Sequence, residues 1–315
     1  MSPKIFITGA TGLIGGDFLV IATEKHPEWK ISVLIRDPEK SQLVNELFPD
    51  VRVVRGSLED VDMLKAESKA ADVVLNFANC DHLPAAEAII RGLSQRDQTG
   101  TVIHTSGAKI IAWEMESQPS TWGTFMPRRY NDLEGVEELT TVPCESNPNP
   151  TGYDHILPNW AAHRDVDLAI LNGFHKHANV QTAIPLSIPR LLNVVLHLRQ
   201  AFTINGNENK WNMVHTQDIL ELYVLLTEAA VEGRKEGLWN EKEFVWGDVI
   251  RRIASLGYQK GLLVSDTPVD LSNGVVNQFW RGGQMNMSST SLGEACRARK
   301  LLGWNPTRDG FFGGY

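Results

Sequence analysis

The first 105 residues alternate between short apolar runs and longer segments with helical spacing, and this alternation constrains the fold more than any other feature. Short apolar runs are typical of buried strands, whereas apolar residues at every third or fourth position indicate helices. The expected strands cover residues 4–8, 31–35, 51–54, 72–77 and 101–105, and the expected helices cover 12–24, 38–48, 61–70 and 83–96. Strands that alternate with helices of this length form a parallel sheet with helices on both faces. The sequence therefore predicts a doubly wound α/β fold.

The alternation stops at residues 106–158, a segment rich in Pro, Asn, Ser, Thr and Glu. A long excursion of this kind inside a domain is typical of a lid or a substrate wall. Regular spacing resumes with a helix over 159–178, a sixth strand over 180–184 and later helices over 216–232, 246–255 and 292–302. We therefore expect a Rossmann domain over residues 1–185 that contains the excursion. A smaller, mostly helical substrate lobe without a sheet of its own is expected over 186–315.

Composition excludes several classes of function. The net charge is −8 and no run of Lys and Arg is present, so direct nucleic-acid binding is not expected. The apolar stretches are too short to span a bilayer and no signal peptide follows Met1, so we expect a cytoplasmic protein without a membrane partner. The 3 cysteines are far apart, and His175 and His177 lie on different faces of a helix, so no metal site is predicted. A monomer or a homodimer is expected.

A glycine motif, Gly9-x-x-Gly12-x-x-Gly15, stands between the first expected strand and the first expected helix. In a dinucleotide site the first glycine permits the tight turn, the second lets the pyrophosphate approach the backbone, and the third lets the helix pack on the sheet. Free amides at the start of the helix favour the phosphates. The predicted phosphate-binding residues are Gly9, Thr11, Gly12, Leu13 and Ile14.

The end of the second strand bears on the choice of cofactor. An NAD site usually places an acidic residue there, but the first polar residue in this chain is Arg36. Its guanidinium can bind a 2′-phosphate through charge-assisted hydrogen bonds, and Lys40 offers a second positive charge nearby. These two cations predict NADP as the cofactor. Asp37 is the competing candidate, because its carboxylate can accept from a ribose hydroxyl while Arg36 stacks on the adenine.

Several motifs together resemble a known family. They are TGATGLIGG, the strand ends VLIRD and VVRGSLED, NFAN after the fourth strand, HTSG after the fifth, and the later WNMVHTQDIL and LLGWNPT. The chain resembles an NmrA-like, atypical or extended short-chain dehydrogenase/reductase. The resemblance implies that Ser57 and Leu58 border the adenine, that Phe77 and Ala78 run under the ribose, and that Ser106 lies beside the nicotinamide. Because similar proteins are frequent in fungal secondary metabolism, it also implies a bulky, polycyclic or aromatic small-molecule substrate.

The chain departs from this family at the catalytic dyad. Reductases of this superfamily use a Tyr as proton donor and a Lys four residues later, and none of the 5 tyrosines has such a lysine. Alignment on the acidic Asp167 places His163 at the lysine position and Asn159 at the tyrosine position. His163 can bind ribose hydroxyls or act as an acid near neutral pH, with Asp167 holding its tautomer. The alternative is an ordinary surface pair between these two side chains.

Other residues are candidates for the missing groups. Tyr130 and Tyr153, both in the excursion, can supply a phenol or can be half-buried loop aromatics. Ser106 follows a parallel strand, where ligands of open sheets bind, although it can also cap a turn. Lys109 can replace the missing cation or can remain solvated. Four tryptophans offer either pocket walls or core: Trp113, Trp122, Trp160 and Trp211.

Three functions follow from these residues. The first is NADP(H)-dependent hydride transfer to a carbonyl, an imine or a conjugated double bond, for which an activated acceptor lowers the need for the tyrosine. The second is redox-neutral isomerisation, dehydration or cyclisation with retained NADP, in which Ser106, His163 and the loop tyrosines act as acid and base. The third is a non-catalytic sensor of NADP. An apolar wall over the nicotinamide favours an enzyme over a sensor.

Overall fold

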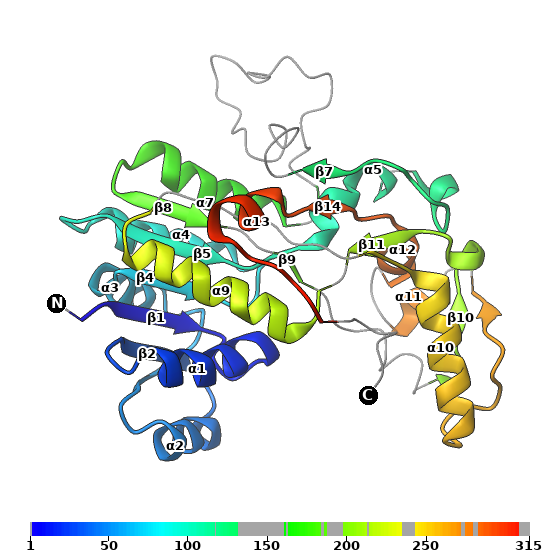
Figure 1. Ribbon diagram of the computed structural model, residues 1–315, viewed down its shortest axis with the longest axis horizontal. Helices are drawn as coiled ribbons and strands as arrows, with labels where there is room; N and C mark the ends of the chain where they lie inside the picture. Colours follow the sequence, from blue (N-terminus) through cyan, green and yellow to red (C-terminus); the bar gives the residue numbers. More distant parts are fainter. Residues whose placement is uncertain are drawn as a thin grey trace.

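We describe the chain from a computed structural model. The structure describes residues 2–116, 118–131, 161, 163–183, 186–187, 198–212, 214–234, 243–271, 275–279 and 283–308. These residues form a sheet domain and a second lobe beyond the end of the sheet (Figure 1). Among them, no helix has both the length and the apolar character needed to cross a membrane.

The main sheet has six strands, and every neighbouring pair is parallel. The strands are β1 (Lys4–Thr8), β2 (Lys30–Ile35), β3 (Arg52–Arg55), β4 (Val73–Asn76), β5 (Gly100–His104) and β8 (Val180–Ala183). Their order is β3-β2-β1-β4-β5-β8, so the direction of winding changes between β1 and β4. Ligands of such sheets bind at the carboxyl ends of the strands beside this switch point. The predicted doubly wound Rossmann fold is therefore confirmed.

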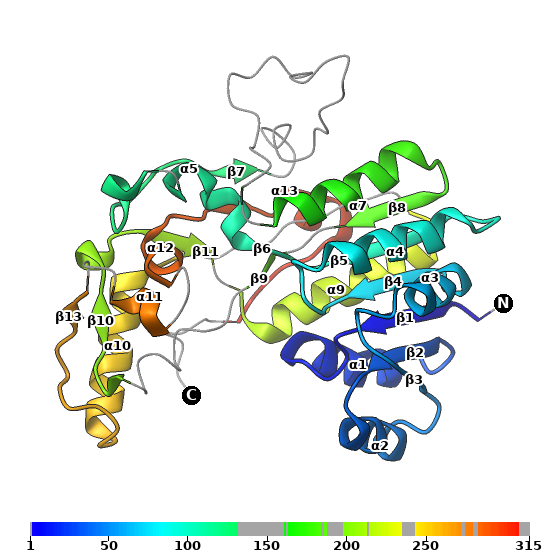
Figure 2. The same cartoon turned by 180° about the vertical axis from the view of Figure 1, so that it is seen from behind.

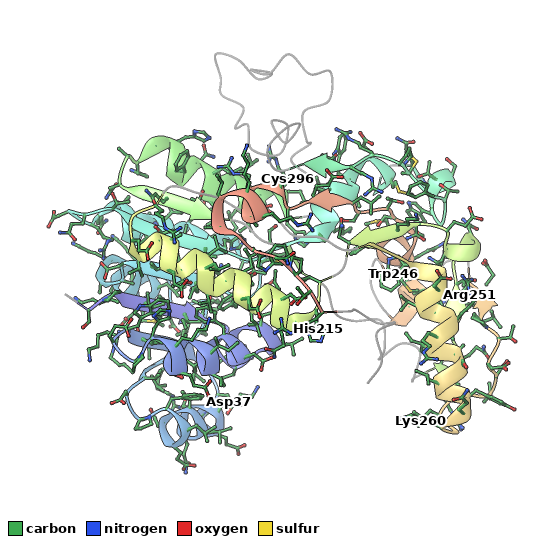
Figure 3. The ribbon with its side chains drawn as sticks, in the orientation of Figure 1. Asp37, His215, Trp246, Arg251, Lys260 and Cys296 are labelled. Atoms are coloured by element: carbon green, nitrogen blue, oxygen red, sulfur yellow. The ribbon has the colours of Figure 1, made fainter. Side chains whose placement is uncertain are left out.

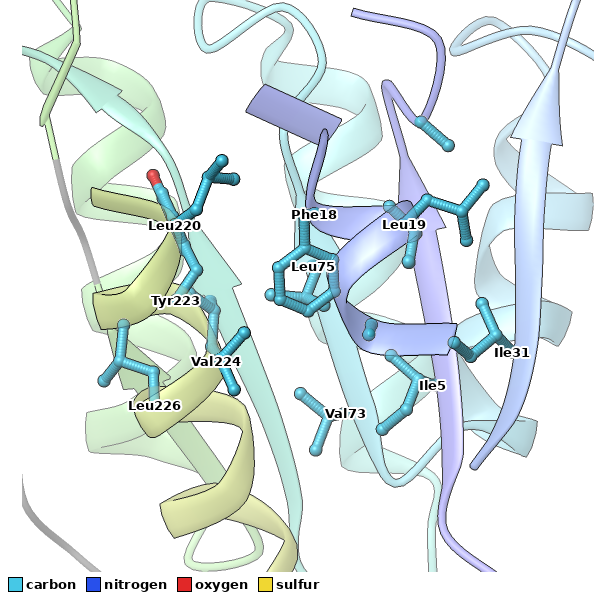
Figure 4. Close-up of a cluster of buried hydrophobic side chains, with 14 of the residues drawn as sticks. Ile5, Phe18, Leu19, Ile31, Val73, Leu75, Leu220, Tyr223, Val224 and Leu226 are labelled. Atoms are coloured by element: carbon cyan, nitrogen blue, oxygen red, sulfur yellow. The ribbon is translucent and has the colours of Figure 1, made fainter. Parts of the chain in front are cut away.

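Helices cover both faces of this sheet (Figures 1 and 2). They are α1 (Leu13–Lys25), α2 (Pro38–Leu47), α3 (Val61–Ala70), α4 (Leu83–Ser94), α7 (Arg164–Lys176) and α9 (Thr216–Val231). The helices α3, α4 and α7 pack against one another on one face, and α1 packs against α9 on the other. Figure 4 shows the core under α1 and α9, where Phe18, Leu75 and Tyr223 meet.

This core draws on residues from both sides of position 185. Leu220 and Tyr223 of α9 are fully buried in it with Ile5 and Phe18 of the first two elements. The helix α13 (Cys296–Leu302) and Trp304 complete the same cluster, and the Trp304 Nε1 donates to the Asp218 carbonyl oxygen at 2.8 Å. The sheet domain is thus built from two separate stretches of the chain.

The second lobe lies beyond the carboxyl ends of the main strands (Figure 1). Its elements are β10 (Phe202–Thr203), η3 (Asn205–Asn207), β11 (Lys210–Asn212), β12 (Glu243–Val245), α10 (Trp246–Gln259), β13 (Val269–Asp270), α11 (Val276–Phe279) and α12 (Gly283–Ser288). The expectation that this lobe has no sheet was wrong, because β10 pairs with β13 and β11 pairs with β12. Trp211 and Trp246 meet edge to face in its core, 5.9 Å between ring centroids.

The first half of the excursion lies against the second lobe. It contains β6 (Ser106–Gly107), η1 (Ala108–Ala112), α5 (Trp113–Glu116), η2 (Pro119–Thr121) and β7 (Tyr130–Asn131). β6 pairs with β9 (Leu186–Ser187), and β7 pairs with β14 (Gly293–Glu294). The Gly123 amide donates to the Ser288 carbonyl oxygen at 2.7 Å. This half is therefore a wall beside the carboxyl edge of the sheet, and residues 132–158 lie outside the described ranges.

Candidate functional site

The glycine turn after β1 has three glycines with different steric roles. Gly9 has φ +75°, and a Cβ there would lie 2.7 Å from the Ala78 nitrogen. A Cβ at Gly15 would lie 2.3 Å from the Gly9 carbonyl oxygen, whereas a Cβ at Gly12 would lie 3.3 Å from that same oxygen, its one close contact among the described residues. Gly9 and Gly15 are therefore needed to form the turn, and Gly12 leaves open the space in front of the helix.

The first turn of α1 is suited to an anion. Gly12 is the N-cap residue, no described side chain caps the helix there, and its first turn contains no acidic residue. The amides of Leu13 and Ile14 therefore lack the carboxylate or hydroxyl that usually occupies a helix start. Leu13 is 66% exposed, so among the described residues this end of the helix is open to solvent. Unpaired amides and the helix dipole together favour a phosphate at this position.

The end of β2 presents a cation to solvent. Arg36 and Lys40 are exposed, and Asp37 is the N-cap of α2 (Figure 3). Asp37 Oδ1 accepts from the amides of Glu39 and Lys40 at 2.9 and 3.2 Å. One oxygen of the carboxylate that competes with Arg36 for the cofactor is thus engaged by the start of α2.

The ends of β3 and β4 contain the residues expected beside the adenine and the ribose. Ser57 and Leu58 lie in the turn after β3, where the Ser57 amide donates to Asp60 Oδ2 at 2.7 Å. Phe77 and Ala78 follow β4, and the glycine turn packs directly against their backbone at Gly9. The structure therefore brings Phe77 and Ala78 next to the glycine turn.

A chain of buried polar side chains crosses the sheet at its carboxyl edge. Thr8 Oγ1 donates to Asn76 Oδ1 at 2.5 Å, and Asn76 Nδ2 donates to His104 Nδ1 at 2.9 Å. Ser106 Oγ donates to Asp167 Oδ2 at 2.8 Å, and His104 Nε2 lies 3.8 Å from Asp167 Oδ1. Ser106 is only 2% exposed, and its hydroxyl is engaged by Asp167.

Burial sets the charges in this chain. Burial and the nearby charge of His163 lower the pKa of His104 to about 4, so this ring is neutral at pH 7. Burial raises the pKa of Asp167 to about 7, although the hydrogen bond from Ser106 opposes the rise. Asp167 was expected to hold the tautomer of His163, and that expectation was wrong because its carboxylate contacts Ser106 and faces His104.

His163 lies between the ends of β4 and β5, with its backbone in the left-handed region at φ 67°. Its Nδ1 is 2.5 Å from Asp81 Oδ1 and 3.5 Å from Cys80 Sγ. Burial disfavours the charged ring, but the hydrogen bonds to Asp81 and Cys80 outweigh it and raise the pKa of His163 to about 10. The same contact lowers the pKa of the Asp81 carboxyl. His163 is therefore at the predicted edge of the sheet, but its partner is Asp81.

Gly107 fixes the place of the His163 ring. A Cβ at Gly107 would lie 2.1 Å from His163 Nε2, so the ring packs flush against the backbone of β6. Sequence reasoning missed this arrangement, together with Cys80 and Asp81. The available signal was their position directly after β4, where the ends of parallel strands collect functional groups.

The tyrosine candidates have different surroundings. Tyr130 is buried, its hydroxyl accepts from Trp113 Nε1 at 3.1 Å, and the Arg128 guanidinium lies 4.8 Å from its ring centroid. These contacts favour a structural role for Tyr130, while Tyr153 lies outside the described residues. Tyr223, which the sequence did not single out, shares a hydrogen bond of 2.6 Å with Thr105, and burial raises its pKa.

Two of the four tryptophans are core residues. Trp113 and Trp211 are buried, and Trp211 Nε1 donates to the Ser289 carbonyl oxygen at 2.6 Å. Trp122 Nε1 donates to the Met115 carbonyl oxygen at 2.8 Å, and Trp160 lies outside the described residues. Internal partners for the indole N–H groups favour core over pocket walls.

The fold and the glycine turn define the chain as a protein of the Rossmann type, and residues 1–94 match the NmrA-like family. The expected resemblance to that family is thereby confirmed over this segment. An oxidase, ucsJ, of Acremonium sp is 26% identical, with 97% of this chain and 93% of that protein aligned. The uncharacterized protein YLL056C of Saccharomyces cerevisiae is 22% identical, covering 98% of this chain and 96% of that protein.

Solved structures share the fold. The dTDP-glucose 4,6-dehydratase DesIV of Streptomyces venezuelae, with NAD and TYD bound, has a TM-score of 0.61 and 16% identity, covering 97% of this chain and 92% of that one. The UDP-glucuronic acid 4-epimerase of Bacillus cereus, in complex with NAD, has a TM-score of 0.61 and 14% identity, covering 97% and 94%. At these identities the likeness concerns the fold.

Proposed function

We propose that this protein is an NADP(H)-dependent oxidoreductase that acts on a bulky small molecule with a carbonyl, an imine or a conjugated double bond. The observation that carries the proposal is the start of α1 at Gly12, which no described side chain caps. The similarity to a fungal oxidase and the NAD in related folds support a nicotinamide dinucleotide at this position.

The residues present fit such a cofactor. The amides of Leu13 and Ile14 would hold the pyrophosphate, and Phe77 and Ala78 would lie along the path from the glycine turn to the nicotinamide end. When bound, the nicotinamide supplies or accepts a hydride. The described residues with accessible polar groups near that end include Cys80, Asp81 and His163.

His163 is the best candidate for an acid at this end. Its ring is charged at neutral pH, and its side chain is 15% exposed. Ser106 is less suited because it is only 2% exposed and its hydroxyl donates to Asp167, whereas the His163 ring is more exposed although its Nδ1 pairs with Asp81. An iminium or conjugated acceptor suits a site without a Tyr and Lys dyad, since such a substrate already carries its activation or takes its proton from solvent.

The choice of NADP is supported by the end of β2. Arg36 is exposed there, and Asp37 Oδ1 is engaged at the start of α2. We therefore expect Arg36→Ala to weaken NADPH binding about tenfold to a hundredfold, because the 2′-phosphate loses its hydrogen bonds to the charged guanidinium. NADH has no 2′-phosphate, so its binding should remain almost unchanged. Isothermal titration of both cofactors measures this difference.

The matched control is Arg52→Ala. Arg52 starts the neighbouring strand at the opposite edge of the sheet and pairs with Glu67, so its loss should leave both cofactors unaffected. Equal weakening of NADPH and NADH by Arg36→Ala would show that Arg36 does not bind the 2′-phosphate.

A redox-neutral reaction with retained cofactor is the second candidate, because dehydratases and epimerases share this fold. The two functions differ in cofactor consumption. Incubation with NADPH and a panel of polycyclic quinones, enones and iminium ions should give oxidised cofactor in proportion to reduced product for the oxidoreductase. Conversion of the organic compound with no net change in the cofactor would favour the redox-neutral function.

A further inference from the structure

We propose that Cys80, Asp81 and His163 form a binding site for a divalent cation of the zinc type. The Sγ of Cys80, a carboxylate oxygen of Asp81 and the Nδ1 of His163 all lie within 4.8 Å of one another. They come from two parts of the chain, the loop after β4 and the residue that precedes α7. The site is defined without any cofactor, but it shares His163 with the proposed function, because a metal on Nδ1 replaces the proton that an acid at this position would donate.

The ligand types select the metal. Sulfur, imidazole nitrogen and carboxylate oxygen are the three donors that zinc uses in proteins, whereas magnesium and calcium prefer oxygen donors alone. Three protein ligands leave a fourth position for water or substrate, which is typical of catalytic zinc sites. The Asp81 side chain is 57% exposed, so this fourth position can open to solvent on its side.

The spacing agrees with tetrahedral coordination at two of the ligands. Bonds of about 2.3 Å to sulfur and about 2.0 Å to nitrogen at a tetrahedral angle separate these atoms by roughly 3.5 Å. The observed distance from Cys80 Sγ to His163 Nδ1 is 3.5 Å. Asp81 Oδ1 lies closer, 2.5 Å from His163 Nδ1, and its carboxylate must move outward by about 1 Å to bind. Its exposure permits this movement.

The imidazole is held in place before any metal arrives. The His163 ring packs against Gly107, where a Cβ would lie 2.1 Å from Nε2, and this contact directs Nδ1 toward Cys80 and Asp81. The loop that carries the other two ligands is also fixed, because the Asp81 amide donates to Asn79 Oδ1 at 3.2 Å. Preorganised ligands of this kind increase metal affinity.

The test uses the full chain, stripped with a chelator and titrated with Co²⁺ and then Zn²⁺. We expect one Co²⁺ per chain, with the visible bands of tetrahedral cobalt and a near-ultraviolet band from thiolate to cobalt. Cys80→Ser should remove the near-ultraviolet band, and Zn²⁺ should displace the cobalt. The matched control is Cys296→Ser, which changes a cysteine on α13 that is in no disulfide and should keep the band (Figure 3).

Two further variants sharpen the result. Gly107→Ala displaces the imidazole and should weaken Zn²⁺ at least tenfold, as loss of a supporting contact does in known sites. Lys109→Met removes a positive charge that acts on Asp81, and it should tighten Zn²⁺ binding. Absence of cobalt binding in the folded wild-type chain, or a thiolate band that survives Cys80→Ser, would overturn the proposal and leave His163 and Asp81 as a simple ion pair.

Discussion

Gly12→Val is expected to abolish NADPH binding while the protein stays folded. The added side chain would stand in front of the first turn of α1, in the space that the pyrophosphate needs. Among the described residues its Cβ meets the Gly9 carbonyl oxygen, at 3.3 Å, and no other atom within 4 Å. We expect affinity to fall by at least about a hundredfold, roughly 2.7 kcal/mol, with a loss of only a few degrees in Tm.

The comparison variant is Gly15→Ala. Its Cβ would lie 2.3 Å from the Gly9 carbonyl oxygen, so the turn itself must shift. We therefore expect Gly15→Ala to lower both stability and cofactor affinity, in contrast to Gly12→Val. Fluorescence titration with NADPH and thermal unfolding separate the two effects. Normal NADPH binding by a folded Gly12→Val variant would place the phosphates elsewhere.

Asp167→Asn is expected to stabilise the protein relative to the wild type, and by more at pH 8 than at pH 5. The pKa of Asp167 is raised to about 7, so the folded state binds more protons than the unfolded state between about pH 4 and pH 7. Stability from this group therefore falls as the pH rises through that window, and the full cost is present at pH 8. Asparagine keeps an oxygen for Ser106 and cannot ionise. A gain of about 1 to 3 kcal/mol at pH 8 is expected.

His104 has the opposite dependence and masks this effect in the wild type. Its pKa is lowered to about 4, so its contribution to stability is lost as the pH falls from about 6.5 toward 4. In mildly acidic solution the two groups change the free energy of unfolding in opposite directions with pH, so their effects partly cancel. The difference in unfolding free energy between the wild type and Asp167→Asn isolates the contribution of the aspartate. Urea unfolding of both proteins at pH 5 and pH 8 measures it. An equal difference at the two pH values would show that Asp167 does not titrate in this window.

Much of the sheet domain could be predicted because its signals are local. The helix α3 covers Val61–Ala70, as its apolar spacing predicts, and the strands of the main sheet agree with the expected strands to within a residue or so. The paired strands of the second lobe could not be predicted, since two or three residues, as in β10 or β11, are too short for a period to be visible. The spacing in α9 indicated a helix, but not the core in which it packs.

In the candidate site, too, the features that depend on local sequence could be predicted, and those that depend on contacts between distant residues could not. The glycine turn and Arg36 belong to a motif read within one strand and one helix, and their positions follow from that motif. Ser106 and Asp167 are 61 residues apart, and His163 and Asp81 are 82 residues apart. Such pairs depend on the direction of individual side chains at the ends of different strands. No periodicity in the sequence contains that information.

The helix α9 and Trp304 complete the core of the sheet domain, but they are synthesised after all of its main strands. One apolar side of the main sheet is covered by α1 together with residues beyond position 215, and Trp304 is among the last described residues of the chain. All six main strands, the last of which ends at Ala183, therefore leave the ribosome before α9 (Thr216–Val231), and one face of the nascent sheet lacks this cover until α9 has emerged. A fragment that ends at residue 185 would keep this apolar surface exposed. We expect such a fragment to aggregate or to remain bound to chaperones.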